Sequence, residues 1–88
     1  MLVKKEDSME QKLRRDMSIG KNLRRLRKSA GLSQEKLCAK LQLLGVDIQR
    51  STYEKYEGGE LNVRVSVLVG LSKIYECSYD EFFSGLSL

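Results

Sequence analysis

The sequence contains no histidine, no proline and no tryptophan, and it has only two cysteines. General acid–base catalysis at neutral pH most often uses histidine, so its absence argues against an enzyme. The absence of proline suits helices joined by glycine turns. Cys38 and Cys77 lie outside any CxxC pattern and away from other metal ligands. We therefore expect two small core residues rather than a zinc site or a disulfide, and no cofactor.

Long apolar runs are missing as well. No stretch approaches the roughly 18 unbroken apolar residues of a membrane-spanning helix. Charges begin at Lys4 and Lys5 with no apolar stretch behind them, so no secretory signal is visible. We expect a cytoplasmic protein with no membrane partner.

The charges that are present are unevenly distributed. The 88 residues suffice for one domain, and 41% of them are apolar. Residues 1–56 carry 14 Lys and Arg against 7 Asp and Glu, whereas residues 57–88 carry 2 against 5. Random scatter can give such a split, but it also suits a positive face that meets a polyanion.

Apolar residues at helical spacing predict an all-α domain of five or six helices. Residues 1–17 are expected to form an N-terminal arm or a short helix, or to extend the next helix. The domain proper is expected over residues 18–88. Its helices are predicted at about 18–30, from the N-cap Ser33 to Gly45, at 49–57, at 65–76, and as a short last helix after Ser78.

The same spacing predicts the core. Tyr53 and Tyr56 lie three residues apart and should face inward, with their hydroxyls at the rim. One residue of the pair Val46 and Ile48, and one of the pair Phe82 and Phe83, should also be buried. The expected core stripe of the helix at 65–76 consists of Val65, Leu68, Leu71 and Tyr75.

The second and third predicted helices carry the functional signal. Two helices joined by so few residues cross steeply, and the later one projects. A helix fits the major groove of DNA if its outward side chains can bond to base edges. Arg50 can donate to guanine O6 and N7. Ser51 and Thr52 can bond a base or a phosphate, and Lys55 can do either; the alternative is that these residues are ordinary solvated side chains.

The strings IGKNLRRLRKSAGLSQEKLCAKL (19–41), RSTYEKYEGG (50–59) and SYDEFF (78–83) resemble the lambda-type phage repressor and Cro (Xre) helix-turn-helix regulators. The resemblance covers residues 18–83 and implies a lambda-repressor-like fold. It also implies that Gln34 contacts a phosphate and supports the recognition helix.

The resemblance further assigns roles within and around the third helix. Base reading falls to Arg50, Ser51 and Lys55, and a backbone contact to Thr52. A salt bridge is implied between Arg27 and Glu57. The joint before residue 50 is longer than in the shortest family members. Because Glu60 stands where a basic residue often meets phosphate, that contact is expected to pass to Arg64.

These patterns predict a sequence-specific, double-stranded DNA-binding transcriptional regulator, a repressor acting as a homodimer, with no small-molecule substrate. The alternative is a protein-interaction adaptor or antitoxin-type partner with the same fold and weak or no DNA binding. Glu60 and the acidic C-terminal third favour this alternative slightly.

Overall fold

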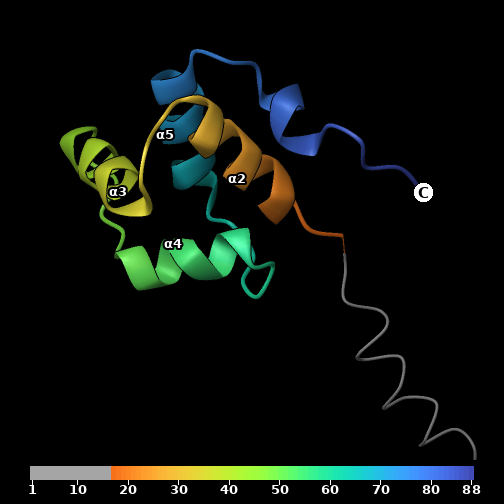
Figure 1. Cartoon of the computed structure of the whole chain (residues 1–88), viewed down its shortest axis with the longest axis horizontal. Coiled ribbons are helices and arrows are strands. Elements are labelled where there is room, and N and C mark those ends of the chain that lie inside the picture. The colour runs from red at the N-terminus through yellow and green to blue at the C-terminus, as the bar shows by residue number, and fades with distance from the viewer. Residues whose placement is uncertain (1–16) are drawn as a thin grey trace, which may run out of the picture.

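The computed structural model describes residues 17–88, so residues 1–16 of the predicted N-terminal arm lie outside the described part (Figure 1). Residues 17–88 form an all-helical domain without strands. The elements are the α-helices α2 (Gly20–Ser29), α3 (Gln34–Leu43), α4 (Arg50–Glu57) and α5 (Val65–Tyr75), and the 3-10 helix η1 (Tyr79–Phe83). The predicted all-α class is confirmed, but the short last helix is a 3-10 helix.

Local signals set the ends of the first two helices. Gly31, which follows α2, has a φ of 72°. This left-handed conformation favours glycine and terminates the helix as predicted. The Ser33 Oγ accepts a hydrogen bond of 3.1 Å from the Lys36 backbone N–H, which confirms Ser33 as the N-cap of α3.

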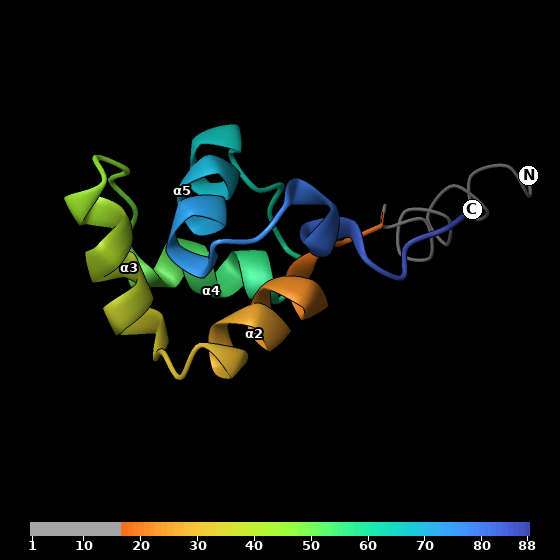
Figure 2. The same ribbon diagram turned by 90° about the horizontal axis from the view of Figure 1, so that it is seen from above.

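The four α-helices enclose one core. In Figure 1, α4 runs beneath α5 while α3 stands at one end, and Figure 2 shows the same arrangement from above. α4 packs against both α2 and α3, α5 packs against α3, and η1 packs against α2. The Asn22 side-chain amide fastens the C-terminal end to α2, because it donates hydrogen bonds of 2.9 Å to the carbonyls of Phe82 and Ser84.

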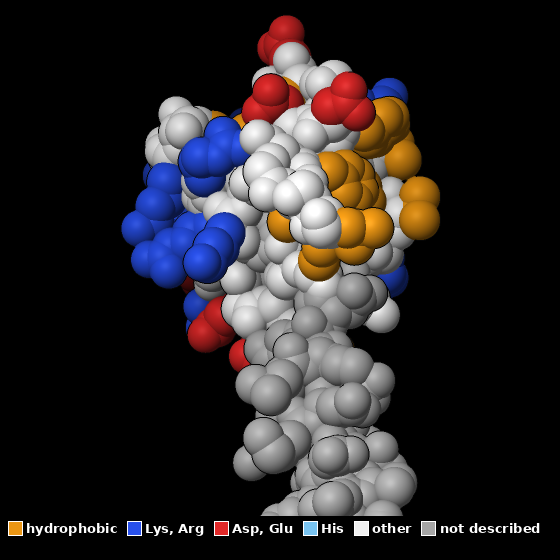
Figure 3. Space-filling view, turned by 90° about the vertical axis from the view of Figure 1, so that its right-hand side faces the viewer, with side chains coloured by type: hydrophobic (Ala, Val, Ile, Leu, Met, Phe, Trp, Pro, Cys, Tyr) orange, Lys and Arg blue, Asp and Glu red, His pale blue; other side chains and the backbone are white. Residues whose placement is uncertain are grey.

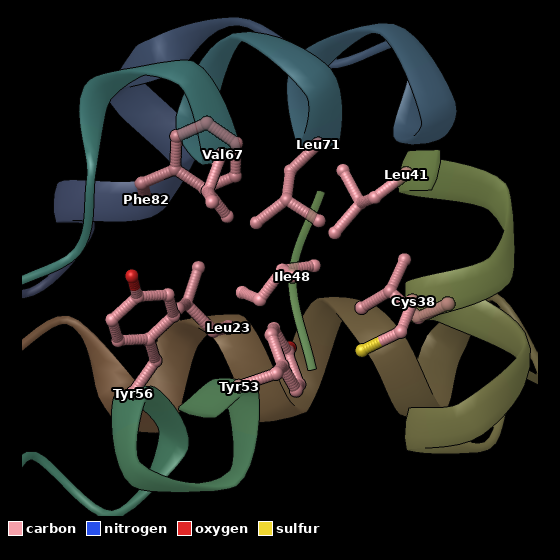
Figure 4. Close-up of a cluster of buried hydrophobic side chains, with 10 residues drawn as sticks. Leu23, Cys38, Leu41, Ile48, Tyr53, Tyr56, Val67, Leu71 and Phe82 are labelled. Carbon is pink, nitrogen blue, oxygen red and sulfur yellow. The ribbon is translucent and has the colours of Figure 1, made fainter. Parts of the chain in front are cut away.

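The core lies between α4 on one side and α5 with η1 on the other (Figure 4). Tyr53 and Tyr56 are buried, as predicted, and meet edge to face with ring centroids 6.3 Å apart. The buried apolar side chains are Leu23, Leu37, Cys38, Leu41, Ile48, Tyr53, Tyr56, Val67, Leu71 and Phe82. Of the pairs left open by the sequence, Ile48 and Phe82 are the fully buried members.

Two predictions about the core are wrong. Val65 is 74% exposed, and Val67 is buried in its place. The other three residues of the predicted stripe are confirmed, since Leu71 is buried and Leu68 and Tyr75 pack against the core. α5 is apolar on most sides, so its spacing alone does not separate the two valines. The Tyr53 hydroxyl is buried rather than at the rim.

Both cysteines are free thiols. Cys38 is buried in the core and Cys77 packs half-buried against it. Across residues 17–88 no helix combines the length and apolar character needed to cross a membrane. The same part of the chain contains no group of three or more side chains suited to hold a metal ion.

Candidate nucleic-acid interface

The joint between α3 and α4 is held in a fixed conformation. Gly45 turns the chain with a φ of 88°, and the Val46 N–H bonds back to the Leu41 carbonyl at 2.9 Å. Ile48 anchors the end of the joint in the core. From the start of α5, the Arg64 Nη2 donates a 2.7 Å hydrogen bond to the Asp47 carbonyl. The joint therefore delivers α4 to the surface at a defined position.

α4 divides into a buried side and a solvent-facing side. Its two tyrosines fix it from behind, and Figure 4 shows both side chains rising from α4 into the core. The residues Arg50, Ser51, Glu54 and Lys55 are exposed and Thr52 is half-buried. We call the outward side of α4 made by these five residues the reading surface. A helix held in this way can present polar side chains to a groove without losing core packing.

An ion pair connects the end of α4 with α2. The Arg27 Nε lies 2.6 Å from Glu57 Oε2, and the Arg27 Nη2 lies 3.0 Å from Glu57 Oε1. The two side chains are only 11% and 6% exposed. Arg27 also donates a 2.8 Å hydrogen bond to the Leu32 carbonyl, so it fastens the turn before α3 as well. This pair orients α2, α3 and α4 relative to one another.

The pair changes the proton affinity of both partners. The hydrogen bonds to Glu57 raise the pKa of Arg27 despite its burial. Burial by itself would raise the pKa of Glu57, but hydrogen bonds from Arg27 and Gln34 more than offset it, and the Glu57 pKa is lowered. Both side chains are therefore charged at neutral pH.

Gln34 joins this ion pair to the reading surface. Its Nε2 donates a 3.1 Å hydrogen bond to Glu57 Oε1. Its Oε1 accepts a 3.3 Å hydrogen bond from Arg50 Nη1. Since Gln34 is the first residue of α3 and Arg50 is the first of α4, the N-terminal ends of these two helices lie together.

The structure thus brings Arg27, Gln34, Arg50 and Glu57 into one connected group. Ser51, Thr52 and Lys55 lie on the same short helix, whereas Arg64 lies apart at the joint, bound to the Asp47 carbonyl. The sequence reasoning gave no role to Glu54, whose Oε1 lies 3.5 Å from Arg50 Nη1. Their i, i+4 spacing with opposite charges was the available signal.

α2, which packs against α4, carries further exposed charge. Figure 3 shows Lys and Arg side chains gathered on one side of the face that it draws and hydrophobic side chains on the other. The exposed basic residues of α2 are Lys21, Arg24, Arg25 and Lys28. In the acidic C-terminal part of the chain, the exposed Glu81 lies close to α2, with its Oε1 3.8 Å from Arg25 Nη2.

A short, fixed joint between two crossing helices, with the second helix anchored behind and polar in front, defines a helix-turn-helix. A family model described as "Helix-turn-helix domain" matches residues 18–82, most of the chain. The chain belongs to this family, which is typical of Xre-like DNA-binding domains. Comparisons with curated proteins and with solved structures found no match.

Proposed function

We propose that this chain is a sequence-specific double-stranded DNA-binding regulator of transcription that reads the major groove with α4. The observation that supports this function best is the two-sided character of α4. Buried tyrosines fix its inner side, and an arginine, a serine, a threonine and a lysine make up most of the reading surface. Donors of this kind match the acceptors on base edges and phosphates.

Each site residue has a separate role in this proposal. Arg50 donates to guanine O6 and N7, with Ser51 and Lys55 reading neighbouring bases and Thr52 bonding the DNA backbone. Gln34 lies at the N-terminal end of α3, where a phosphate is favoured by the helix dipole. Its Nε2 donates to Glu57 and its Oε1 accepts from Arg50, so a phosphate oxygen can accept from the second N–H of Nε2 with both contacts in place.

Arg64 has a different part. Its guanidinium lies at the joint before α4, where one nitrogen donates a hydrogen bond to the Asp47 carbonyl. Guanidinium has five N–H donors, so a phosphate can be bonded without breaking that contact. Arg64 would then hold the joint and the duplex together.

The regulator is proposed to act as a homodimer and a repressor. One α4 reads only a few base pairs, so two copies on half-sites about 34 Å apart are needed for a distinctive target. Occupation of the duplex is sufficient to exclude competing proteins, which makes repression the simplest action. Residues 18–88 are proposed as the DNA-binding domain, with residues 1–17 as an arm before it.

Selection of bound sequences from random duplexes tests this function. We expect a two-fold symmetric consensus with half-sites about one helical turn apart. Affinity for that consensus should fall at least about 100-fold between 50 and 200 mM salt, because several phosphate contacts release counterions. Failure to enrich any sequence would contradict the proposal.

A second candidate is a protein-interaction adaptor or antitoxin-type partner on the same fold. Exposed apolar side chains near the C-terminal end, Tyr79, Phe83 and Leu86, favour a protein contact there. The acidic residue Glu60 after α4 is also unfavourable near phosphates. The selection separates the two candidates, since an adaptor would enrich no sequence and would show no preference for one duplex over a scrambled duplex of the same length.

A further inference from the structure

Arg50, the first residue of α4, is held from two sides. Its Nη1 donates to Gln34 Oε1 at 3.3 Å and lies 3.5 Å from Glu54 Oε1. The first acceptor comes from α3 and the second from the next turn of α4. The Arg50 and Glu54 side chains are 53% and 59% exposed, so both remain accessible on the reading surface.

The acceptor on α3 is itself fixed in orientation. Gln34 uses its amide nitrogen to donate to Glu57 Oε1 at 3.1 Å, which leaves the amide oxygen directed at Arg50. Glu57 is in turn held by the buried ion pair with Arg27. A chain of donors and acceptors therefore runs from the core to the reading surface and ends at Glu54.

Both acceptors engage the same nitrogen of Arg50, and this matters for the rest of the guanidinium. Its Nε and Nη2 form a second edge with two parallel donors, and this edge makes no hydrogen bond to any residue of the described part. Two parallel donors are what guanine O6 and N7 accept. Because only Nη1 is engaged, the Nε–Nη2 edge remains available to bond a base.

The carboxylate of Glu54 also acts on the surrounding DNA. A negative charge on the reading surface repels phosphates whatever the base sequence, and it partly neutralises the charge that Arg50 offers to them. An exposed pair one helical turn apart adds little to folding stability. The main effect of Glu54 is therefore expected on DNA binding: its charge lowers the affinity for any duplex, and its hold on Arg50 is what distinguishes one target from another.

We propose that Glu54 is a specificity-determining positioning residue. Together with Gln34 it holds Arg50 with the Nε–Nη2 edge outward, and it weakens sequence-independent attachment to phosphates. More of the binding free energy then comes from a correctly placed guanine than from contacts with the DNA backbone. This inference rests on the proposed function of α4.

The test compares Glu54→Gln with the unaltered full chain. Dissociation constants are measured at one salt concentration for the selected duplex and for a scrambled duplex of the same length. We expect Glu54→Gln to bind the scrambled duplex more tightly and the ratio of the two constants to fall about tenfold. Glu76→Gln is the matched control, because it removes the same charge at the exposed end of α5; its ratio should stay close to that of the unaltered chain.

A second arm asks whether Glu54 acts through Arg50. In an Arg50→Ala background, Glu54→Gln should change the ratio by less than about twofold, because the side chain that it positions is gone. An unchanged ratio for Glu54→Gln alone would overturn the inference. An equal fall in the Arg50→Ala background, or an equal effect of Glu76→Gln, would do the same.

These outcomes differ from a failure of the proposed function. If the unaltered chain binds the selected and scrambled duplexes equally, DNA reading by α4 is contradicted and the inference falls with it. If the unaltered chain discriminates and Glu54→Gln discriminates equally well, the function stands and only the role of Glu54 is lost. Circular dichroism of each variant shows whether it is folded.

Discussion

Glu57 lies at the point where α4 meets the rest of the domain. It accepts hydrogen bonds from Arg27 and Gln34, and its side chain is almost fully removed from solvent. Removal of one partner from a buried ion pair leaves the other charge without compensation. The energetic role of this residue is therefore larger than that of the exposed charges on α4.

Glu57→Gln is expected to lower the free energy of unfolding by about 3 kcal/mol at neutral pH, since Arg27 then lacks its buried counter-charge. The pKa of Glu57 in the folded protein is below its ordinary value of 4.5. The contribution of the ionised Glu57 to the free energy of unfolding is thus fully present above that value, and it is lost as the pH falls through the lowered pKa. Denaturant unfolding of both proteins across acidic and neutral pH measures the difference.

The two unfolding free energies should converge on acidification, because a protonated Glu57 resembles glutamine. Glu60→Gln serves as the control, since Glu60 is exposed and its loss should change stability by less than about 0.5 kcal/mol. A stability difference between Glu57→Gln and the unaltered protein that stayed constant down to acidic pH would contradict this account of the ion pair.

At the scale of helices, the start of α2 lies close against the end of α4. A Cβ atom at Gly20 would lie 2.7 Å from the Tyr56 carbonyl oxygen, and closer still to that of Glu57. Backbone atoms cannot turn aside as a flexible side chain can. Glycine at this position is therefore required for the packing of α2 on α4, quite apart from its conformational freedom.

Gly20→Ala is expected to lower the unfolding free energy by about 2 kcal/mol, because the two helices must separate to admit the methyl group. Gly58→Ala is the matched control. Gly58 has a φ of −81°, and its nearest neighbour would be the flexible end of Glu60 at 3.2 Å. That variant should be unchanged or stabilised by up to about 1 kcal/mol.

Thermal or denaturant unfolding of the two alanine variants supplies the comparison. Equal stability of Gly20→Ala and Gly58→Ala would show that α2 and α4 are not packed backbone to backbone. A DNA-binding loss in Gly20→Ala without a loss of stability would also contradict this reason for the glycine.

The helices themselves were largely predictable from the sequence, since Ser33, Gly31 and the leucine spacing act locally. The inward face of α5 was predicted in part: Leu71 is buried and Leu68 and Tyr75 pack against the core, but Val67 is the buried valine in place of Val65, and the two are equally apolar. η1 is too short for periodicity to separate a 3-10 helix from an α-helix.

The candidate site was likewise predictable only in part. The sequence placed Arg50, Ser51 and Lys55 on one outward side through spacing alone. Orientation of Arg50 between Gln34 and Glu54 depends on how the ends of α3 and α4 meet, which spacing within one helix does not reveal.

For the whole molecule, the uneven charge of the sequence becomes an uneven surface. Basic side chains of α2 and α4 lie on the N-terminal elements, and the acidic residues Glu76, Asp80 and Glu81 lie at and beyond the end of α5. The proposed dimer would bring two basic halves to one duplex. At DNA-binding concentrations its mass in solution should be that of two chains, and in the presence of the selected duplex that of two chains plus one duplex.

Base reading by Arg50 is tested most sharply by removing single acceptor atoms from the DNA. In the selected duplex, each guanine is replaced in turn by 7-deazaguanine, which lacks the N7 acceptor, and affinity is measured for the unaltered chain and for Arg50→Ala. We expect the unaltered chain to lose about tenfold in affinity at one guanine of each half-site, and Arg50→Ala to be insensitive there. If the unaltered chain tolerates the replacement at every guanine, or if Arg50→Ala is sensitive at the same guanine, Arg50 does not read the base and the central claim is wrong.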